Sequence, residues 1–110
     1  MIAKVKIDPG ICGFHTNVVA TSEDDQFVRF DIKTSCEKVR DLANVLHEKG
    51  DIDAFREINP ADESIILASA KSTLVGCCAG CAVAAGVMKA AQVATGLALP
   101  KDVSITVTKE

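Results

Sequence analysis

The sequence predicts an α+β fold in which a four-stranded, mainly antiparallel sheet carries helices on one face. Three strand-like segments joined by short turns come first, a helical middle follows, and one more strand-like segment closes the chain. The short turns make the first three strands an antiparallel meander, and helices on one face of the sheet bury the apolar sides of both layers. At 110 residues the chain has the length of one domain, so we expect a single α+β domain over residues 1–110.

The first and third predicted strands show apolar residues at every second position, and the second is marked by β-branched residues. Residues 3–7 alternate apolar side chains with lysine, and a proline and two glycines in residues 9–13 predict a tight loop after them. Residues 15–21 are rich in β-branched side chains, and residues 22–25 form an acidic turn. Residues 28–32 place apolar and charged side chains on opposite faces, as expected for a half-buried strand.

The middle of the chain has helical spacing. Thr34 and Glu37 match the capping-box pattern, which predicts a helix with Thr34 as its N-cap. Gly50 predicts the end of this helix, and residues 52–58 allow one or two further helical turns.

Two more helices and a strand complete the predicted fold. Residues 60–63 open a short helix predicted over residues 61–70, and an alanine-rich run predicts a helix over residues 79–95 that Gly96 ends. Residues 103–108 alternate valine and isoleucine with serine and threonine, which predicts a closing C-terminal strand in the sheet.

Charge and hydropathy exclude several classes of partner. The formal net charge is −3 and no group of lysines or arginines forms a stripe, so we expect no nucleic-acid or anionic-membrane partner. The N-terminal residues alternate as a strand does and do not resemble a signal peptide, so we expect a cytoplasmic protein. Residues 74–99 are apolar, but Lys89 and Gln92 among them favour a buried helix over a membrane span.

The cysteines carry the strongest functional signal. Three of the five are Cys77, Cys78 and Cys81, and the last two form a C-x-x-C unit whose thiols reach one metal ion. In a reducing compartment, an odd number of cysteines indicates metal binding or reactive thiols rather than structural disulfides. Gly76 and Gly80 let backbone N–H groups approach the sulfurs, as in iron–sulfur sites. The alternative interpretation is that these small side chains only pack at the start of a helix.

Cys12 and Cys36 supply the remaining ligands of the predicted site. Cys12 lies in the glycine loop after the first strand, and Cys36 lies in the first turn of a helix, whose dipole stabilises a thiolate. A tetrahedral thiolate site needs four ligands. Because adjacent Cys77 and Cys78 point in different directions, we expect one of them to join Cys12, Cys36 and Cys81.

Other catalytic signals are missing from the sequence. It contains no nucleophile elbow, P-loop, dinucleotide-binding glycine motif or zinc-protease motif. His15 is explained by a strand edge, and His47 by a favourable contact with a helix C-terminus. These observations favour a binding protein over an enzyme.

We therefore expect a metal-binding protein that holds an iron–sulfur cluster, with a Cys₄ zinc site as the alternative because ferredoxin spacing is absent. It would act as a small redox or cluster-carrier module and would need a redox or cluster-transfer protein as its partner. Two other interpretations stay open: a thiol–disulfide oxidoreductase that uses Cys78 and Cys81, and a structural or partner-binding domain. An exposed C-terminal strand would also allow pairing across a homodimer.

Three stretches of the chain resemble a family of small uncharacterised cysteine-containing proteins from anaerobic archaea and bacteria. They are residues 9–14 (PGICGF), 77–81 (CCAGC) and 96–103 (GLALPKDV), and the resemblance extends over nearly the whole chain. That family has no assigned activity, so the resemblance implies no reaction. It implies an anaerobic setting, in which an exposed iron–sulfur cluster is better tolerated.

Overall fold

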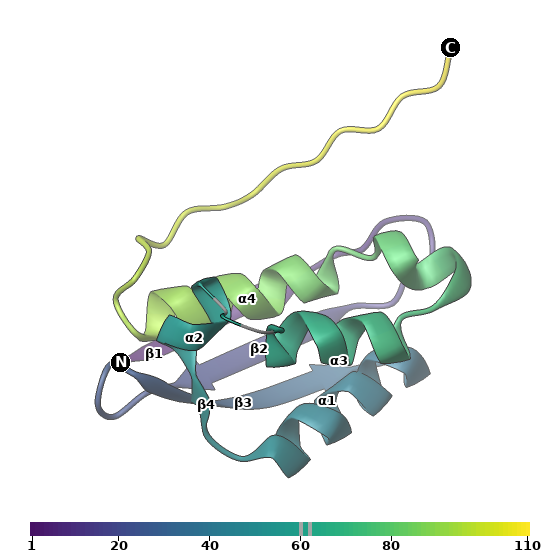
Figure 1. Ribbon diagram of the computed structural model, residues 1–110. Helices are drawn as coiled ribbons and strands as arrows, with labels where there is room; N and C mark the ends of the chain where they lie inside the picture. Colours follow the sequence, from purple (N-terminus) through teal and green to yellow (C-terminus); the bar gives the residue numbers. More distant parts are fainter. Residues whose placement is uncertain (60, 62) are drawn as a thin grey trace.

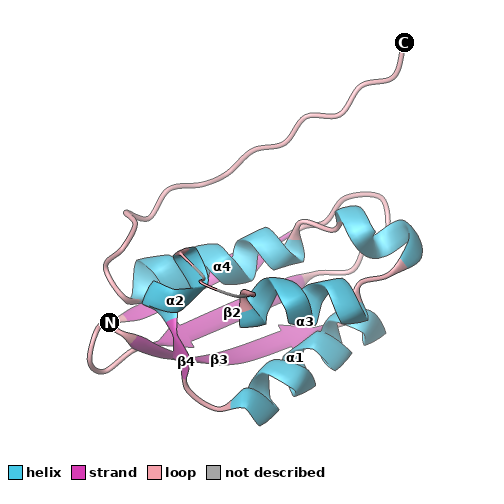
Figure 2. Cartoon of the chain, in the orientation of Figure 1, coloured by secondary structure: helices cyan, strands magenta, loops and turns pink. Residues whose placement is uncertain are grey.

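The computed structural model describes residues 1–59, 61 and 63–110 and confirms the predicted α+β class (Figure 1). Figure 2 shows the strands as one layer with helices beside it. In chain order the elements are β1 (Ile2–Ile7), β2 (Thr16–Thr21), β3 (Phe27–Thr34), α1 (Glu37–Lys49), β4 (Ile52–Asp53), α2 (Ala54–Ile58), α3 (Ile65–Thr73), the 3₁₀-helix η1 (Gly76–Gly80) and α4 (Val83–Ala94).

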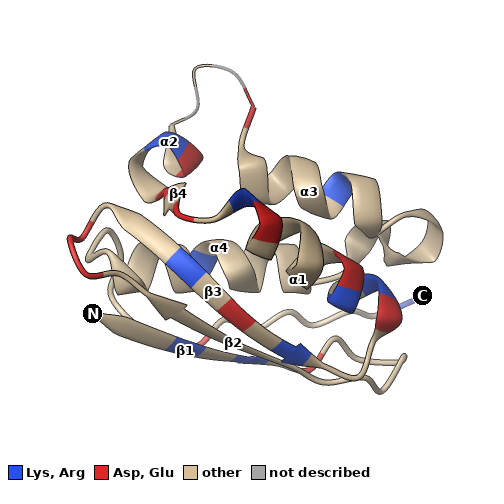
Figure 3. Cartoon of the chain, turned by 90° about the horizontal axis from the view of Figure 1, so that it is seen from below, with Lys and Arg blue, Asp and Glu red and all other residues tan. Residues whose placement is uncertain are grey.

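The sheet has the strand order β1-β2-β3-β4 and is antiparallel throughout. The predicted three-strand meander is therefore confirmed. Its register aligns Val5, Val18 and Ile32 in one row on the face toward the helices. The opposite face of β3 carries exposed charged side chains, which Figure 3 shows as alternating blue and red segments along the strand.

The fourth strand is not the predicted one. β4 pairs with Phe27 and Val28 and comes from residues 52–58, which were expected to be helical. The expected closing strand over residues 103–108 is wrong, because residues 99–110 form neither helix nor strand and are all exposed (Figure 1). Alternation shows that a segment suits a strand but not which sheet edge accepts it, and two-residue β4 is too short for any periodicity to reveal.

The helices cover one face of the sheet, as predicted. α4 packs on β1 and β2, α1 packs along β3, and α3 fills the space between α1 and α4. The core between these layers contains the most deeply buried aliphatic side chains, Val18, Val28, Val39, Leu42, Leu46, Ile52, Ile66, Val83 and Val87.

The start of α1 differs from the predicted capping box. Thr34 ends β3, and the N-cap is Cys36, which makes no side-chain capping hydrogen bond. The Thr34 hydroxyl pairs instead with the Thr16 hydroxyl at 2.8 Å and accepts the Cys36 N–H at 3.1 Å. Thr34 therefore belongs to β3 and does not cap α1, although the local sequence predicts it as the N-cap. Gly50 ends α1 with a φ of 71°, as predicted.

The later helices begin further along the chain than predicted. The helix expected over residues 61–70 is α3, and its N-cap is Ser64, whose hydroxyl accepts the Leu67 N–H at 3.1 Å. Of the expected opening residues, Pro60 and Asp62 lie outside the described residues. The helix expected from residue 79 is α4, which starts at Val83 after the separate η1 turn.

A buried carboxylate that the sequence does not reveal is Glu57 of α2, which is 4% exposed. It accepts hydrogen bonds from the Ser64 hydroxyl at 3.0 Å and from the N–H groups of Ile65 at 2.9 Å and Ile66 at 2.6 Å. Those N–H groups belong to the first turn of α3, where a helix has unpaired donors and a positive partial charge. Glu57 therefore links α2 to α3.

The stretch Gly76–Ala94 is long and apolar enough to cross a membrane by length and composition alone. About a third of it is buried, and its α4 part packs along β1 and β2. The core helix of a folded domain has the same composition, so this stretch is only weak evidence for a membrane span.

Candidate thiolate site

All five cysteines come from segments that lie at one end of the sheet, where β1 ends, β2 begins and β3 ends (Figure 1). Cys12 is in the β1–β2 loop and Cys36 connects β3 to α1. Two hydrogen bonds join these connections: the Ser35 N–H donates to the His15 carbonyl at 3.3 Å, and the His15 N–H donates to the Ser35 hydroxyl at 3.3 Å. The loops that carry Cys12 and Cys36 are therefore neighbours.

The cysteine cluster of η1 reaches the same end by two contacts. Near the start of α4, Gly86 lies against Ile7, the last residue of β1, so α4 begins over this end of the sheet. In the first turn of α1, the Lys38 ammonium donates a hydrogen bond to the Val75 carbonyl at 2.8 Å. Val75 directly precedes η1, so this bond fastens the cysteine cluster beside the start of α1.

The cysteine cluster was expected to open the helix that became α4. It forms a separate 3₁₀ turn instead, and α4 begins after it. The Cys81 N–H donates to the Cys78 carbonyl at 3.0 Å, which closes a 3₁₀ turn. Cys81 then adopts an extended conformation, and Ala82 is the N-cap of α4. Gly76 has a φ of 68°, which only glycine adopts easily, so it allows the sharp entry into the turn.

The five thiols are free and divide into two groups by burial. Cys36, Cys78 and Cys81 are half-buried and pack against the hydrophobic core, whereas Cys12 and Cys77 are exposed. Adjacent Cys77 and Cys78 therefore have different surroundings, and Cys78 shares its core-facing environment with Cys81.

The structure brings these segments together without assembling a complete ligand set. Within residues 1–59, 61 and 63–110, no three His, Cys, Asp or Glu side chains are close enough to hold one metal ion. His15 is exposed beside the cysteine loops, and His47 lies in the last turn of α1, away from them.

A mainly apolar groove of about 370 Å³ adjoins the cluster. It lies between α3 and the start of α4, and Cys81 and Lys71 are its thiol and its charged group. The residues that line it are Leu67, Ala70, Lys71, Leu74, Val75, Gly76, Ala79, Cys81 and Ala84. The groove was not predictable from the sequence, because its walls come from α3, η1 and the start of α4, and the sequence does not specify how these pack together.

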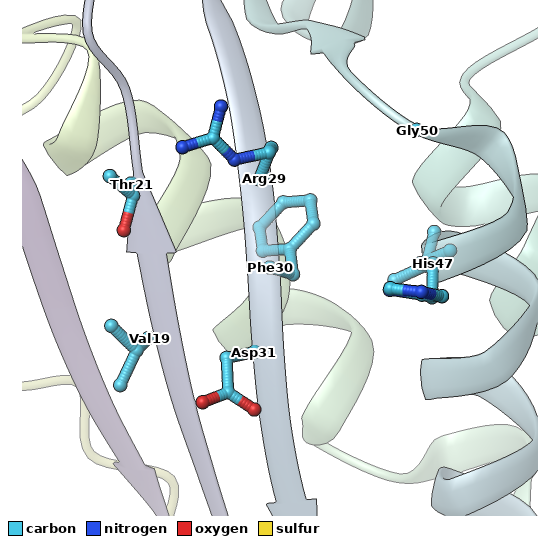
Figure 4. Close-up of a pocket in the computed structure, with 8 residues that line it drawn as sticks. Val19, Thr21, Arg29, Phe30, Asp31, His47 and Gly50 are labelled. Carbon is cyan, nitrogen blue, oxygen red and sulfur yellow. The ribbon is translucent and has the colours of Figure 1, made fainter.

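A second hollow, of about 290 Å³, lies between β3 and the C-terminal half of α1. Figure 4 shows Phe30 and His47 on its two sides, with Arg29 and Asp31 beside Phe30 on β3. No cysteine lines it. This hollow is therefore separate from the thiol chemistry.

Comparison with known proteins gives a family and no function. The model of a family of unknown function (DUF6951) matches residues 3–107. No significant match was found among curated proteins, and none among solved structures. The expected resemblance to an uncharacterised family is confirmed at this level, whereas the anaerobic setting stays a prediction. Because the match extends over nearly the whole chain, the protein belongs to the DUF6951 family of unknown function.

Proposed function

We propose that this protein binds metal through cysteine thiolates and that its cargo is an iron–sulfur cluster, with zinc as the alternative. One observation carries the proposal: five cysteines from three separate segments lie at one end of a fold that has no disulfide among its described residues. Thiolates are the ligands that iron–sulfur clusters and structural zinc prefer.

Packing alone explains only part of this arrangement. Cysteine behaves as a small apolar side chain, which accounts for half-buried Cys36, Cys78 and Cys81. It does not account for Cys12 and Cys77, which are exposed. An exposed thiol without a function is open to oxidation, so two of them beside three half-buried ones favour a chemical role.

The η1 turn would supply the first two ligands of the proposed site. Cys78 and Cys81 occupy one turn and would anchor the metal from one side. No group of three ligands is assembled in the described part of the chain, so a four-thiolate site would draw in two further sulfurs from among Cys12, Cys36 and Cys77. Metal binding would then assemble the ligand set, as it does in other small domains whose ligands come together only with the metal.

A thiol–disulfide oxidoreductase is the second candidate, because Cys81 lines the apolar groove beside Lys71. In this reaction the Cys81 or Cys78 thiolate would attack a disulfide substrate, and the other thiol would resolve the mixed disulfide. The substrate would gain two electrons and two protons as two thiols, and the protein would gain a Cys78–Cys81 disulfide.

Anaerobic reconstitution with iron and sulfide separates these candidates. We expect matched iron and sulfide and a coloured protein, with at least a fivefold lower cluster content in the Cys78→Ser and Cys81→Ser variants. The matched control is Ala79→Ser, which introduces the same serine at an exposed residue of the same turn without removing a thiol. Stoichiometric zinc in the protein as purified would select zinc as the metal. Disulfide reduction by the metal-free protein would select the oxidoreductase. A colourless, metal-free protein without disulfide reductase activity would overturn both the metal-binding proposal and the oxidoreductase proposal.

A further inference from the structure

The C-terminal segment of residues 99–110 is extended and leaves the body of the molecule (Figure 1). Within it, Val103, Ile105 and Val107 are 65%, 71% and 87% exposed. These apolar side chains alternate with serine and threonine, which is the pattern of a strand with one buried face. The match to the family extends to residue 107, so it includes these three side chains.

The sheet offers a free edge of the same length. In the described strand order β1 is an edge strand, and its six residues pair on one side only, with β2. Beside this edge Ile2 is 63% exposed, and Val5 is half-buried although Ala3 and Ile7 on the same face are buried. An added strand would cover Val5 and satisfy the unpaired N–H and C=O groups of β1.

The other open stretch of the sheet is less suitable. Beyond the two residues that pair with β4, the free side of β3 is flanked by α1 and by the hollow that contains Arg29, Asp31 and His47. An apolar strand placed there would meet three polar or charged side chains. At β1, Lys4 and Lys6 would instead lie beside the uncharged polar face of residues 103–108, without like-charge repulsion.

We propose that residues 103–108 of one copy of this chain pair with the free edge of β1 in a second copy, so that the protein is a homodimer joined by strand addition. The chain leaves α4 beside the start of β1, because Gly96 lies next to Met1. This is the end of the sheet far from the cysteines, and the extended C-terminal segment starts from there. It makes no pairing with its own sheet in the described structure and points away from it (Figure 2). Reciprocal exchange of the two segments closes a two-fold dimer. The proposal is independent of the thiolate function, since neither β1 nor residues 103–108 contain a cysteine.

Sedimentation velocity over a concentration series tests this proposal, with reductant and chelator present so that neither disulfides nor metal join the chains. We expect the full chain to have twice the 11.6 kDa mass of one copy. A chain that stops after Pro100 should be monomeric with an unchanged circular dichroism spectrum, because the deleted residues are exposed. Ile105→Asp should raise the dimer dissociation constant by about tenfold or more, whereas the matched control Thr106→Asp, on the polar face, should change it much less.

Isotope-filtered NMR on mixed labelled and unlabelled chains identifies the pairing. Contacts between residues 103–108 of one copy and β1 of the other would support the proposal. A monomeric full chain would overturn it, whether residues 103–108 pair with their own β1 or stay unpaired. A dimer that survives the truncation would overturn it as well.

Discussion

Gly86 of α4 lies directly against Ile7 of β1, so closely that the structure has no space for a side chain at residue 86. A Cβ placed there would lie 2.8 Å from Ile7 Cγ1, which is well inside van der Waals contact. This approach sets the depth at which α4 packs on the sheet. It also holds the start of α4, and with it the η1 cysteines, over the end of β1.

Gly86→Ala should therefore destabilise the fold. The substitution gains about 1 kcal/mol of helix propensity but loses about 1–3 kcal/mol to overpacking, so we expect a net loss of about 1 kcal/mol in chemical denaturation. Gly80→Ala is the matched control, because nothing lies within 4 Å of a Cβ at residue 80. Ile7→Val should relieve part of the loss in the double variant, and strict additivity of the two substitutions would contradict the contact.

Glu57→Ala should cost more stability than most single substitutions. It leaves the Ser64 hydroxyl and the N–H groups of Ile65 and Ile66 without their acceptor in a buried position. We expect a loss of about 2–4 kcal/mol in the free energy of unfolding, measured by urea denaturation. The exposed Glu48→Ala variant should stay within about 0.5 kcal/mol of the parent protein. Equal, small effects of the two substitutions would show that Glu57 does not cap α3.

Lys38→Met should loosen the cysteine cluster while leaving the global fold intact. The substitution removes the ammonium that bonds to the Val75 carbonyl, an exposed bond worth about 0.5–1.5 kcal/mol, and keeps the apolar part of the side chain. We expect faster amide hydrogen exchange over residues 75–81 and a lower cluster content after reconstitution. Lys49→Met, at the other end of α1, should change neither quantity. Unchanged exchange over residues 75–81 in Lys38→Met would contradict the tether.

Asp24 should make the β2–β3 turn sensitive to acid. Hydrogen bonds from the N–H groups of Phe27 and Gln26 hold the pKa of this carboxyl below its usual value of 3.8. Because the folded-state pKa is lowered, the carboxylate contributes stability above about pH 4, and this contribution is lost as the pH falls through the folded pKa. An NMR titration of the Asp24 carboxyl carbon should give a midpoint below 3.8. Asp24→Asn keeps an acceptor oxygen but cannot titrate, so it should remove this part of the acid dependence.

The parts of the fold that the sequence predicted are those with a long, regular period. The meander was predictable because residues 3–7 and 28–33 alternate and residues 16–21 are rich in β-branched side chains, and α1 because Val39, Leu42 and Leu46 repeat at helical spacing before Gly50. The two-residue β4 has no period to detect. Residues 103–108 have a clear period, but their alternation does not say whether the partner edge lies in the same chain.

The sequence predicted which segments carry the candidate site, but it did not predict how those segments are arranged in space. Glycines and element ends placed Cys12 and Cys36 in connections, and the structure places those connections side by side. The separate η1 turn was not predictable, because a 3₁₀ turn and the first turn of an α-helix have the same local composition. The capping box failed at Thr34 because its hydroxyl pairs with Thr16, a contact between strands that local sequence does not reveal.

Titration of the reduced, metal-free protein with Co²⁺ under anaerobic conditions tests the central claim most directly, because the visible spectrum of Co²⁺ reports both its geometry and its thiolate ligands. We predict intense tetrahedral d–d bands together with thiolate-to-cobalt charge transfer, which saturate at one equivalent and weaken in Cys78→Ser and Cys81→Ser but not in Ala79→Ser. The weak spectrum of hexa-aqua Co²⁺ throughout the titration would contradict the proposed thiolate site.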